Sequence, residues 1–316
     1  MKATALVSVV VAAYNAERTI GETLRSLLAQ THDQMEILVG DDASADDTSA
    51  VANSFNDPRI KVFRNTTNLG PGPTRDLLIE AASGDFLAFV DADDVIERDR
   101  FRSMLALMPD DQDCLLFDDI LQCHETAAGL VPWRNVHGPR AFGRRNGNGN
   151  LVGPLALADL ISAKRLLIKP LVSCGAVRRL GARHPGLRYG EDGVFFWRLL
   201  ARGLPAYFLP EARYRYRITP GSASASSSRH DELIQCLELL LEESLEDPDR
   251  QALSRRLARL RANARIRQAA AAGTAGKIRA AGLLLTHPAN LLALIADIPV
   301  ALGYRFSRLK HGGQER

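Results

Sequence analysis

The stretch Gly84–Asp94, GDFLAFVDADD, decides the fold class of this chain. Its apolar residues Phe86–Val90 form a continuous run, which is typical of a strand buried on both faces of a parallel sheet. The carboxylates of Asp91, Asp93 and Asp94 follow directly and repel one another unless a cation or solvent compensates them. Carboxylate oxygens suit Mg²⁺ and Mn²⁺, so the stretch predicts a buried strand that ends in a candidate metal site. The alternative is a solvated acidic turn that caps the next helix.

The residues before this stretch alternate between strand and helix patterns. We expect strands at Leu6–Ala13, Met35–Gly40 and Arg59–Arg64, and helices at Ala16–Gln30, Asp46–Phe55 and Pro73–Ala82. Such alternation predicts an α/β fold with a mostly parallel, Rossmann-like central sheet flanked by helices. Ligands of such sheets bind beyond the carboxyl ends of the strands. Polar clusters lie at three of these ends: Tyr14-Asn15, Asp41-Asp42 and the acidic residues that follow Val90.

After about residue 110 the pattern is less regular. Strands are expected at Cys114–Leu121, Ala206–Leu209 and Arg213–Ile218, and a helix at Gly190–Arg202. From Asp231 onward the chain reads as helical. The sequence therefore predicts a C-terminal helical extension behind the α/β part.

Composition indicates a soluble globular protein with unevenly distributed charge. Of the 316 residues, 46% are hydrophobic and 24% are charged, which excludes collagen-like, disordered and disulfide-framework proteins. The formal net charge is only +3, but residues 251–316 carry 12 Lys and Arg against 2 acidic residues, whereas residues 1–250 carry 28 against 35. The chain is thus an acidic body followed by a basic tail.

The sequence favours a cytoplasmic location. Its four cysteines lack CxxC spacing, so neither a zinc site nor a disulfide framework is expected. A buried first strand explains the short apolar run in Met1–Asn15 better than a signal peptide does. Prolines and polar residues interrupt the apolar stretch Ala281–Tyr304, so it is not expected to span a membrane.

Two polar groups suit the recognition of a nucleoside. One carboxylate of Asp41-Asp42 can accept a hydrogen bond from a base N–H or a ribose hydroxyl; the alternative is a turn with a helix N-cap, which Ser44 or Asp46 supplies. Tyr14 ends the first strand with an aromatic face that can stack on a nucleobase. The alternative for Tyr14 is an ordinary aromatic residue at a strand end.

A third acidic pair, Glu191 and Asp192, lies at the start of the apolar helix expected over Gly190–Arg202. Acidic residues in a first turn interact favourably with the helix dipole, which explains most such pairs. The functional alternative is a general base beside a metal and phosphate site.

Taken together, six ordered motifs resemble the family 2 glycosyltransferases, which have the GT-A fold. The motifs are VSVVVAAYN (Val7–Asn15), EILVGDDASADDT (Glu36–Thr48), NLGPGPTRD (Asn68–Asp76), GDFLAFVDADD (Gly84–Asp94), GEDGVFFWRLLARG (Gly190–Gly203) and YRYRITPGSAS (Tyr214–Ser224). They cover about residues 5–225, and their order is specific although each alone is weak. The chain departs from the family at Asp76, where Asn is usual, and at Thr219, where many members have His. The Gln-x-x-Arg-Trp motif of processive synthases is absent, which favours a single transfer per encounter.

The resemblance implies roles for the matching residues. It assigns nucleotide-sugar binding to Ala12, Tyr14, Asp42, Arg75 and Asp91, metal binding to Asp93 with Asp91, and catalysis to Asp192 with Glu191. In this scheme Ala12 and Tyr14 flank the base, Tyr14 stacks on it, and Asp42 pairs with its N–H. Asp93 is the principal metal ligand. Asp192 is the general base.

The resemblance also implies a domain organisation. Residues 1–228 form the GT-A domain, with a nucleotide-binding half at 1–110 and an acceptor and catalytic half at 111–228. Residues 229–316 form the basic helical extension.

The implied activity is that of an inverting glycosyltransferase in exopolysaccharide or cell-surface glycan synthesis. One sugar passes from a nucleotide sugar, expected to be a UDP-hexose, to a hydroxyl of a saccharide or lipid-linked acceptor. Asp192 takes the proton, and Mn²⁺ or Mg²⁺ stabilises the departing diphosphate. One alternative is a sugar-nucleotide pyrophosphorylase. Such an enzyme requires a Gly-rich basic loop after the first strand, where this chain has Tyr14-Asn15-Ala16-Glu17. The other is a non-catalytic, glycosyltransferase-like assembly partner at the membrane, which the intact Asp93 and Asp192 disfavour.

The basic tail over residues 251–316 has two open interpretations. Its alternating arginines and leucines fit an amphipathic surface for anionic lipids at the inner face of the cell membrane. They fit equally a helix that packs on the domain or mediates oligomerisation. No nucleic-acid recognition motif accompanies the charge. The sequence does not fix the donor sugar, the acceptor or the linkage.

Overall fold

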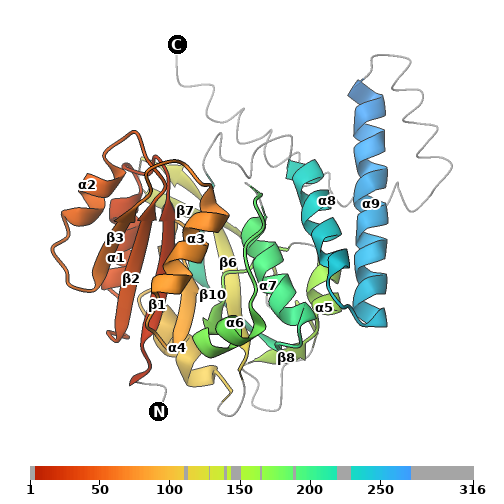
Figure 1. Cartoon of the computed structure of the whole chain (residues 1–316), viewed down its shortest axis with the longest axis horizontal. Coiled ribbons are helices and arrows are strands. Elements are labelled where there is room, and N and C mark those ends of the chain that lie inside the picture. Colours follow the sequence, from red (N-terminus) through yellow and green to blue (C-terminus); the bar gives the residue numbers. More distant parts are fainter. Residues whose placement is uncertain are drawn as a thin grey trace. The chain divides into compact units, whose positions relative to one another are not determined.

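A mixed ten-stranded sheet forms the centre of the described part of the chain (Figure 1). The computed structural model describes residues 4–109, 113–127, 129–138, 141–143, 151–163, 166–187, 190–218 and 229–271. The chain divides into two units, Met1–Ala252 and Leu253–Arg316, and the sheet belongs to the first.

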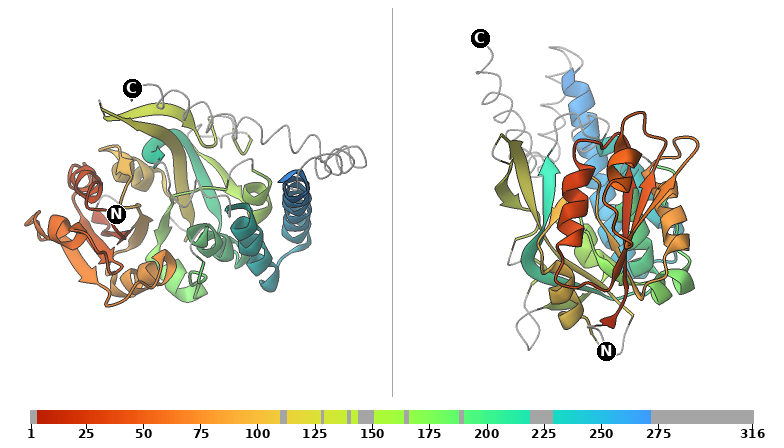
Figure 2. Two further views of the ribbon diagram at one scale, coloured as in Figure 1. Left: turned by 90° about the horizontal axis from the view of Figure 1, so that it is seen from above. Right: turned by 90° about the vertical axis from the view of Figure 1, so that its left-hand side faces the viewer.

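The first half of the sheet is parallel, as the sequence predicts. Strand β1 (Val7–Ala13) pairs with β2 (Met35–Asp41) on one side and with β4 (Phe86–Phe89) on the other, and β3 (Ile60–Arg64) lies beyond β2. The apolar run of β1 is buried because helices cover both faces of the sheet. Helix α1 (Ile20–Leu28) covers one face, and α3 (Pro71–Ala81) covers the other (Figures 1 and 2). The α/β fold is therefore confirmed.

The second half of the sheet contains strands that the sequence pattern did not predict. The strand order is β3-β2-β1-β4-β9-β6-β10-β5. The elements of this half are β5 (Val95–Ile96), β6 (Leu115–Thr126), β7 (Gly129–Asn135), β8 (Val152–Leu155), β9 (Leu171–Ser173) and β10 (Ala206–Ile218). Strand β9 runs antiparallel to both β4 and β6, whereas β10 runs parallel to β6. The two strands expected at 206–209 and 213–218 form one strand, whose register shifts occur beside Pro210, a residue that cannot donate to a ladder.

The remaining helices complete the described residues. They are α2 (Thr48–Asn53), α4 (Arg100–Leu107), α5 (Leu157–Ser162), α6 (Cys174–Leu180), α7 (Glu191–Ala201), α8 (Arg229–Leu239), a short 3-10 helix (Leu240–Glu242) and α9 (Asp247–Ala271). None of the helices in the described ranges is both long enough and apolar enough to cross a bilayer. The stretch Ala281–Tyr304, Thr219 and the tail after Ala271 lie outside the described residues.

Aromatic packing fixes helix α7 against the sheet. The ring of Phe89, the last residue of β4, lies 5.7 Å from that of Phe195 and 5.0 Å from that of Phe196. Because Phe89 comes two residues before Asp91, this contact brings the first turn of α7 to the carboxyl end of β4. The expected catalytic pair and the expected metal site therefore lie at one edge of the sheet.

Candidate active site

The three carboxylates that follow β4 form a tight cluster. Oxygens of Asp91, Asp93 and Asp94 lie within 4.8 Å of one another. Burial, together with the neighbouring carboxylates, raises the pKa of Asp93 to about 6 and the pKa of Asp94 well above its usual range. The protein therefore holds acidic groups here that resist ionisation, and a cation bound among them would relieve their repulsion.

Strand β10 holds the acidic turn in place. Asp94 is fully buried and accepts hydrogen bonds from the Tyr214 hydroxyl at 2.7 Å and from the Arg217 backbone N–H at 2.8 Å. The Arg217 guanidinium donates to the Asp93 carbonyl at 2.7 Å and pairs with Glu125 at 2.8 Å. Sequence reasoning missed both Tyr214 and Arg217 as parts of the site. Both residues belong to the motif YRYR, which was interpreted from the sequence only as a closing strand.

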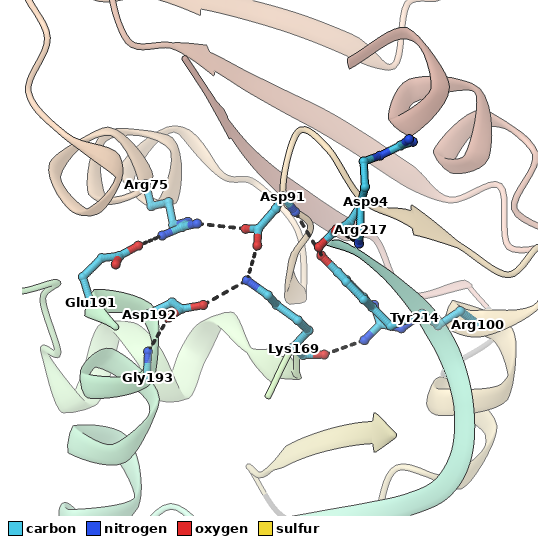
Figure 3. Close-up of polar contacts among 10 residues, drawn as sticks. All are labelled: Arg75, Asp91, Asp94, Arg100, Lys169, Glu191, Asp192, Gly193, Tyr214 and Arg217. Carbon is cyan, nitrogen blue, oxygen red and sulfur yellow. Dashed lines mark hydrogen bonds and ion pairs between the residues drawn. The ribbon is translucent and has the colours of Figure 1, made fainter. Parts of the chain in front are cut away.

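Asp91 lies between two buried cations, as Figure 3 shows. Its Oδ1 accepts from Arg75 Nη2 at 2.9 Å, and its Oδ2 accepts from Lys169 Nζ at 2.6 Å. Arg75 also pairs with Glu191, and Lys169 Nζ lies 2.9 Å from Asp192 Oδ2. Five side chains from four separate segments thus form one chain of ion pairs.

This network shifts the pKa values of the expected catalytic residues, Asp192 and Glu191, in opposite directions. Burial opposes ionisation of Asp192, but Lys169 and Arg75 outweigh it and hold the pKa of Asp192 well below its usual range. For Glu191, burial prevails over the attraction of Arg75, so its pKa is raised. Asp192 is consequently ionised, which is the state a general base starts from, and the same two cations make it a weaker base than a free aspartate.

The expected base-binding residues lie at the ends of the neighbouring strands. Tyr14 follows β1 and is 54% exposed, which leaves its ring accessible for stacking, and Ala12 is half-buried. Asp42 is buried, and its carboxylate accepts hydrogen bonds from the backbone N–H groups of Leu69 and Gly70, each at 2.8 Å, and from Asn65 Nδ2 at 2.8 Å. These hydrogen bonds show that Asp42 stabilises the loop that precedes α3. Its contact with a base N–H stays a prediction.

Asp76, which stands where the family usually has Asn, contacts a residue that the sequence did not point to. The Asp76 carboxylate lies 2.6 Å from Nδ1 of His184, a buried residue in the loop before α7. The His184 ring stacks on Phe195 with a centroid distance of 4.3 Å. A Cβ at Gly72 would lie 2.9 Å from the His184 Cβ, so glycine permits this close approach. The pair joins α3, which carries Arg75, to α7, which carries Asp192.

The donor set fits a hard divalent cation. It consists of carboxylate oxygens without His or Cys, which is the preference of Mg²⁺ and Mn²⁺. Among the described residues, no side chain donates a hydrogen bond to the Asp93 carboxylate, whereas both oxygens of Asp91 already have cationic partners. Asp93 is therefore the best-placed of the three to ligate a metal.

Sequence comparisons relate this chain to known glycosyltransferases. The sequence model of glycosyl transferase family 2 matches residues 8–144. The chain is 42% identical over 99 residues to the succinoglycan biosynthesis protein ExoO of Rhizobium meliloti, a match that covers 31% of this chain and 28% of that protein. It is 27% identical over 225 residues to WfaP of Escherichia coli, named a UDP-Glc:α-D-GlcNAc-diphosphoundecaprenol β-1,3-glucosyltransferase, which covers 70% of this chain and 80% of WfaP.

Solved structures share the fold. TarS of S. aureus in complex with UDP-GlcNAc has a TM-score of 0.64 at 22% identity, over 80% of this chain and 72% of that one. The mannosyltransferase PcManGT of Pyrobaculum calidifontis, solved with GDP-Man and Mn²⁺, has a TM-score of 0.56 at 19% identity, over 95% and 86% of the two chains. At these identities the likeness establishes the common fold and nothing finer.

Proposed function

We propose that this chain, which belongs to glycosyl transferase family 2 through residues 8–144, moves one sugar from a nucleotide sugar to an acceptor hydroxyl with inversion at the anomeric carbon. The observation that carries the proposal is the ion-pair network. It places an ionised Asp192 beside Asp91, the first residue of the acidic cluster. A base and a candidate metal site at one sheet edge are what a single in-line displacement needs.

The donor is proposed to be a UDP-hexose, and the acceptor a saccharide or a lipid-linked saccharide. The printed name of WfaP gives UDP-glucose as donor and a diphosphoundecaprenol-linked sugar as acceptor. TarS, which shares the fold, was solved with UDP-GlcNAc. The exposed ring of Tyr14 at the end of β1 offers a stacking face for the base.

In the proposed mechanism, Asp192 accepts the proton of the acceptor hydroxyl as its oxygen attacks the anomeric carbon. Arg75 is buried close to Asp91 and brings positive charge to the side on which the diphosphate leaves. Asp93, with Asp94 and Asp91 beside it, would hold Mn²⁺ or Mg²⁺, which when bound supplies charge stabilisation for the departing diphosphate. Glu191 holds Arg75 in place.

The metal role predicts a specific loss in the Asp93→Ala variant. UDP-glucose with Mn²⁺ should raise the melting temperature of the wild-type protein, because a ligand that binds only the folded state stabilises it. In Asp93→Ala the affinity for the donor in Mn²⁺ should fall at least ~10-fold, since loss of a ligand weakens metal binding at least as much as loss of an outer-shell partner. Thermal shift titration measures the effect, and Asp33→Ala, which removes an exposed carboxylate, is the control. Unchanged donor affinity in Asp93→Ala would refute the metal assignment.

The raised pKa of Asp93 predicts a pH-dependent stability without metal. Because the folded state holds the proton up to about pH 6 whereas the unfolded state releases it near 3.8, this group lowers stability as pH rises through that window. Asp93→Asn removes the effect. In EDTA at pH 7.5 the variant should be more stable than the wild type by up to about 3 kcal/mol, and at pH 4 the two should be alike. Denaturant unfolding at both pH values measures this, and a difference that is independent of pH would contradict it.

The membrane contact of the basic tail is part of the proposal and has its own prediction. Arg255 and Arg259 are exposed on α9, and each Arg near an anionic surface contributes about 1 kcal/mol to binding. The variant with both changed to Gln should bind vesicles containing phosphatidylglycerol about 30-fold more weakly in co-sedimentation. A matched variant with Arg18 and Arg102 changed to Gln, two exposed residues of the first unit, should bind like the wild type. Equal binding of both variants would exclude α9 as the contact surface.

The domain boundaries are likewise proposed, with a transferase domain at residues 1–228 and a helical extension at 229–316. The transferase domain comprises all the site residues named above. The cytoplasmic side of the membrane is the proposed location, because a nucleotide-sugar donor and a lipid-linked acceptor would both be available there.

A further inference from the structure

We propose that Lys169 is the positioning residue of the catalytic base: its ammonium group joins Asp192 to Asp91 and fixes the Asp192 carboxylate at the edge of the donor site. The inference rests on the proposed function, because it assigns how the base of that reaction is held. Lys169 belongs to none of the six motifs, and its neighbours in sequence are apolar residues and a proline.

Sheet topology explains why Lys169 reaches this place. Strand β9 runs antiparallel to β4, with Leu171 opposite Ala88. Residues just before β9 therefore lie beside residues just after β4. Lys169 precedes Leu171 by two positions and Asp91 follows Ala88 by three, which brings Lys169 Nζ to 2.6 Å from Asp91 Oδ2.

The backbone of Lys169 is itself anchored in the core. Its carbonyl accepts a hydrogen bond at 2.5 Å from Nη2 of Arg100 (Figure 3). Arg100 is itself fully buried in an ion pair with Asp118. The Lys169 side chain is only 2% exposed. With both ends fixed, the ammonium group has little freedom to move, and such a rigid support is what precise placement of a reacting group requires.

The two aspartates depend on Lys169 to different degrees. Asp192 accepts from the Gly193 backbone N–H at 2.7 Å through Oδ1 and from Lys169 at 2.9 Å through Oδ2. In the described part of the chain, Lys169 is the one cation that forms an ion pair with Asp192. Asp91 has a second cation, Arg75. Loss of Lys169 therefore releases the base while Asp91 keeps a partner, so the catalytic step should suffer more than donor binding.

The test is hydrolysis of UDP-glucose in Mn²⁺, with water as the acceptor. In this reaction the water oxygen bonds to the anomeric carbon, the bond from that carbon to the diphosphate oxygen breaks, and Asp192 takes the proton. We expect Lys169→Met to lower kcat about 10- to 100-fold while the donor Kd, from calorimetry, changes less than about twofold. The control is Lys61→Met, which removes a half-exposed lysine paired with Glu36 and should leave both quantities unchanged. An unchanged kcat in Lys169→Met, or a donor Kd that weakens as much as kcat falls, overturns the proposal.

A double variant separates positioning from simple structural support. If Lys169 acts through Asp192, then adding Lys169→Met to Asp192→Asn should lower kcat no further. This double variant also leaves no unpaired Asp192 charge, so it remains informative where the single variant does not fold. Lys169→Arg, which keeps the charge, should recover part of the activity that Lys169→Met loses. A loss in the Asp192→Asn background equal to that in the wild type overturns the proposal.

Failure of the inference is distinguishable from failure of the proposed function. A wild-type protein that neither binds nor hydrolyses any nucleotide sugar with Mn²⁺ contradicts the function itself. An active wild type whose kcat is insensitive to Lys169→Met contradicts only the role of Lys169.

Discussion

Replacing Asp192 by Asn is expected to lower the transfer rate by about 10²- to 10⁴-fold, the usual contribution of a general base. The amide has nearly the same shape as the carboxylate but cannot take the proton of the acceptor hydroxyl. Asp192 lies in the first turn of α7 and contacts Lys169 and Gly193, so its loss removes none of the groups assigned to the donor. Donor affinity should therefore stay within about threefold of the wild type, since the missing interaction belongs to the transition state.

Steady-state rates and calorimetric donor binding together test this expectation. Glu191→Gln is the matched comparison, because Glu191 is the neighbouring acidic residue and its partner is Arg75 rather than Lys169. We expect a smaller loss of kcat in that variant than in Asp192→Asn. If Asp192→Asn retains transfer at the wild-type rate, the assignment of the base is wrong.

Replacing Arg100 by Met is expected to lower the free energy of unfolding by about 3–5 kcal/mol, the usual effect of removing one partner from a buried ion pair. Arg100 and Asp118 are both fully buried and share two hydrogen bonds, of 2.9 and 2.7 Å. Without Arg100, the Asp118 carboxylate stays in the core with no cationic partner, and the Lys169 carbonyl loses its donor. Denaturant unfolding followed by circular dichroism measures the change.

The double variant Arg100→Met with Asp118→Leu isolates the cause. An apolar pair of similar volume should recover most of the lost stability, because the penalty of the single variant comes from the charge left behind. Arg102→Met, which removes an exposed arginine from the same helix, should change stability by less than about 0.5 kcal/mol. A double variant as unstable as Arg100→Met would show that the ion pair itself contributes the stability.

The fold of the first hundred residues was predictable because its signal is local. A continuous apolar run such as Phe86–Val90 has few structural explanations besides a buried strand. Strand β9 gave no such signal, since a strand of three residues is too short for a periodic pattern to emerge. Its place between β4 and β6 depends on contacts between residues far apart in sequence.

The candidate site was predictable only where a motif marks it. Asp91, Asp93 and Asp192 stood out because acidic residues at the ends of apolar elements are conspicuous. Lys169 did not, although a single lysine in an apolar stretch is itself a signal, because lysine is almost never buried without a partner. The sequence separates Lys169 from Asp91 by 78 positions, so only the fold could identify that partner.

Strand β9 has a consequence for hydrogen exchange. Within the described sheet it is the strand that hydrogen-bonds to both β4 and β6, and it has only three residues, Leu171–Ser173. Local fraying of α1 or of the β6–β7 hairpin leaves its amides protected. They exchange only when the two halves of the sheet separate, so their protection factors report the cohesion of the whole sheet. A bound donor that slows exchange at these amides would show that the halves are drawn together.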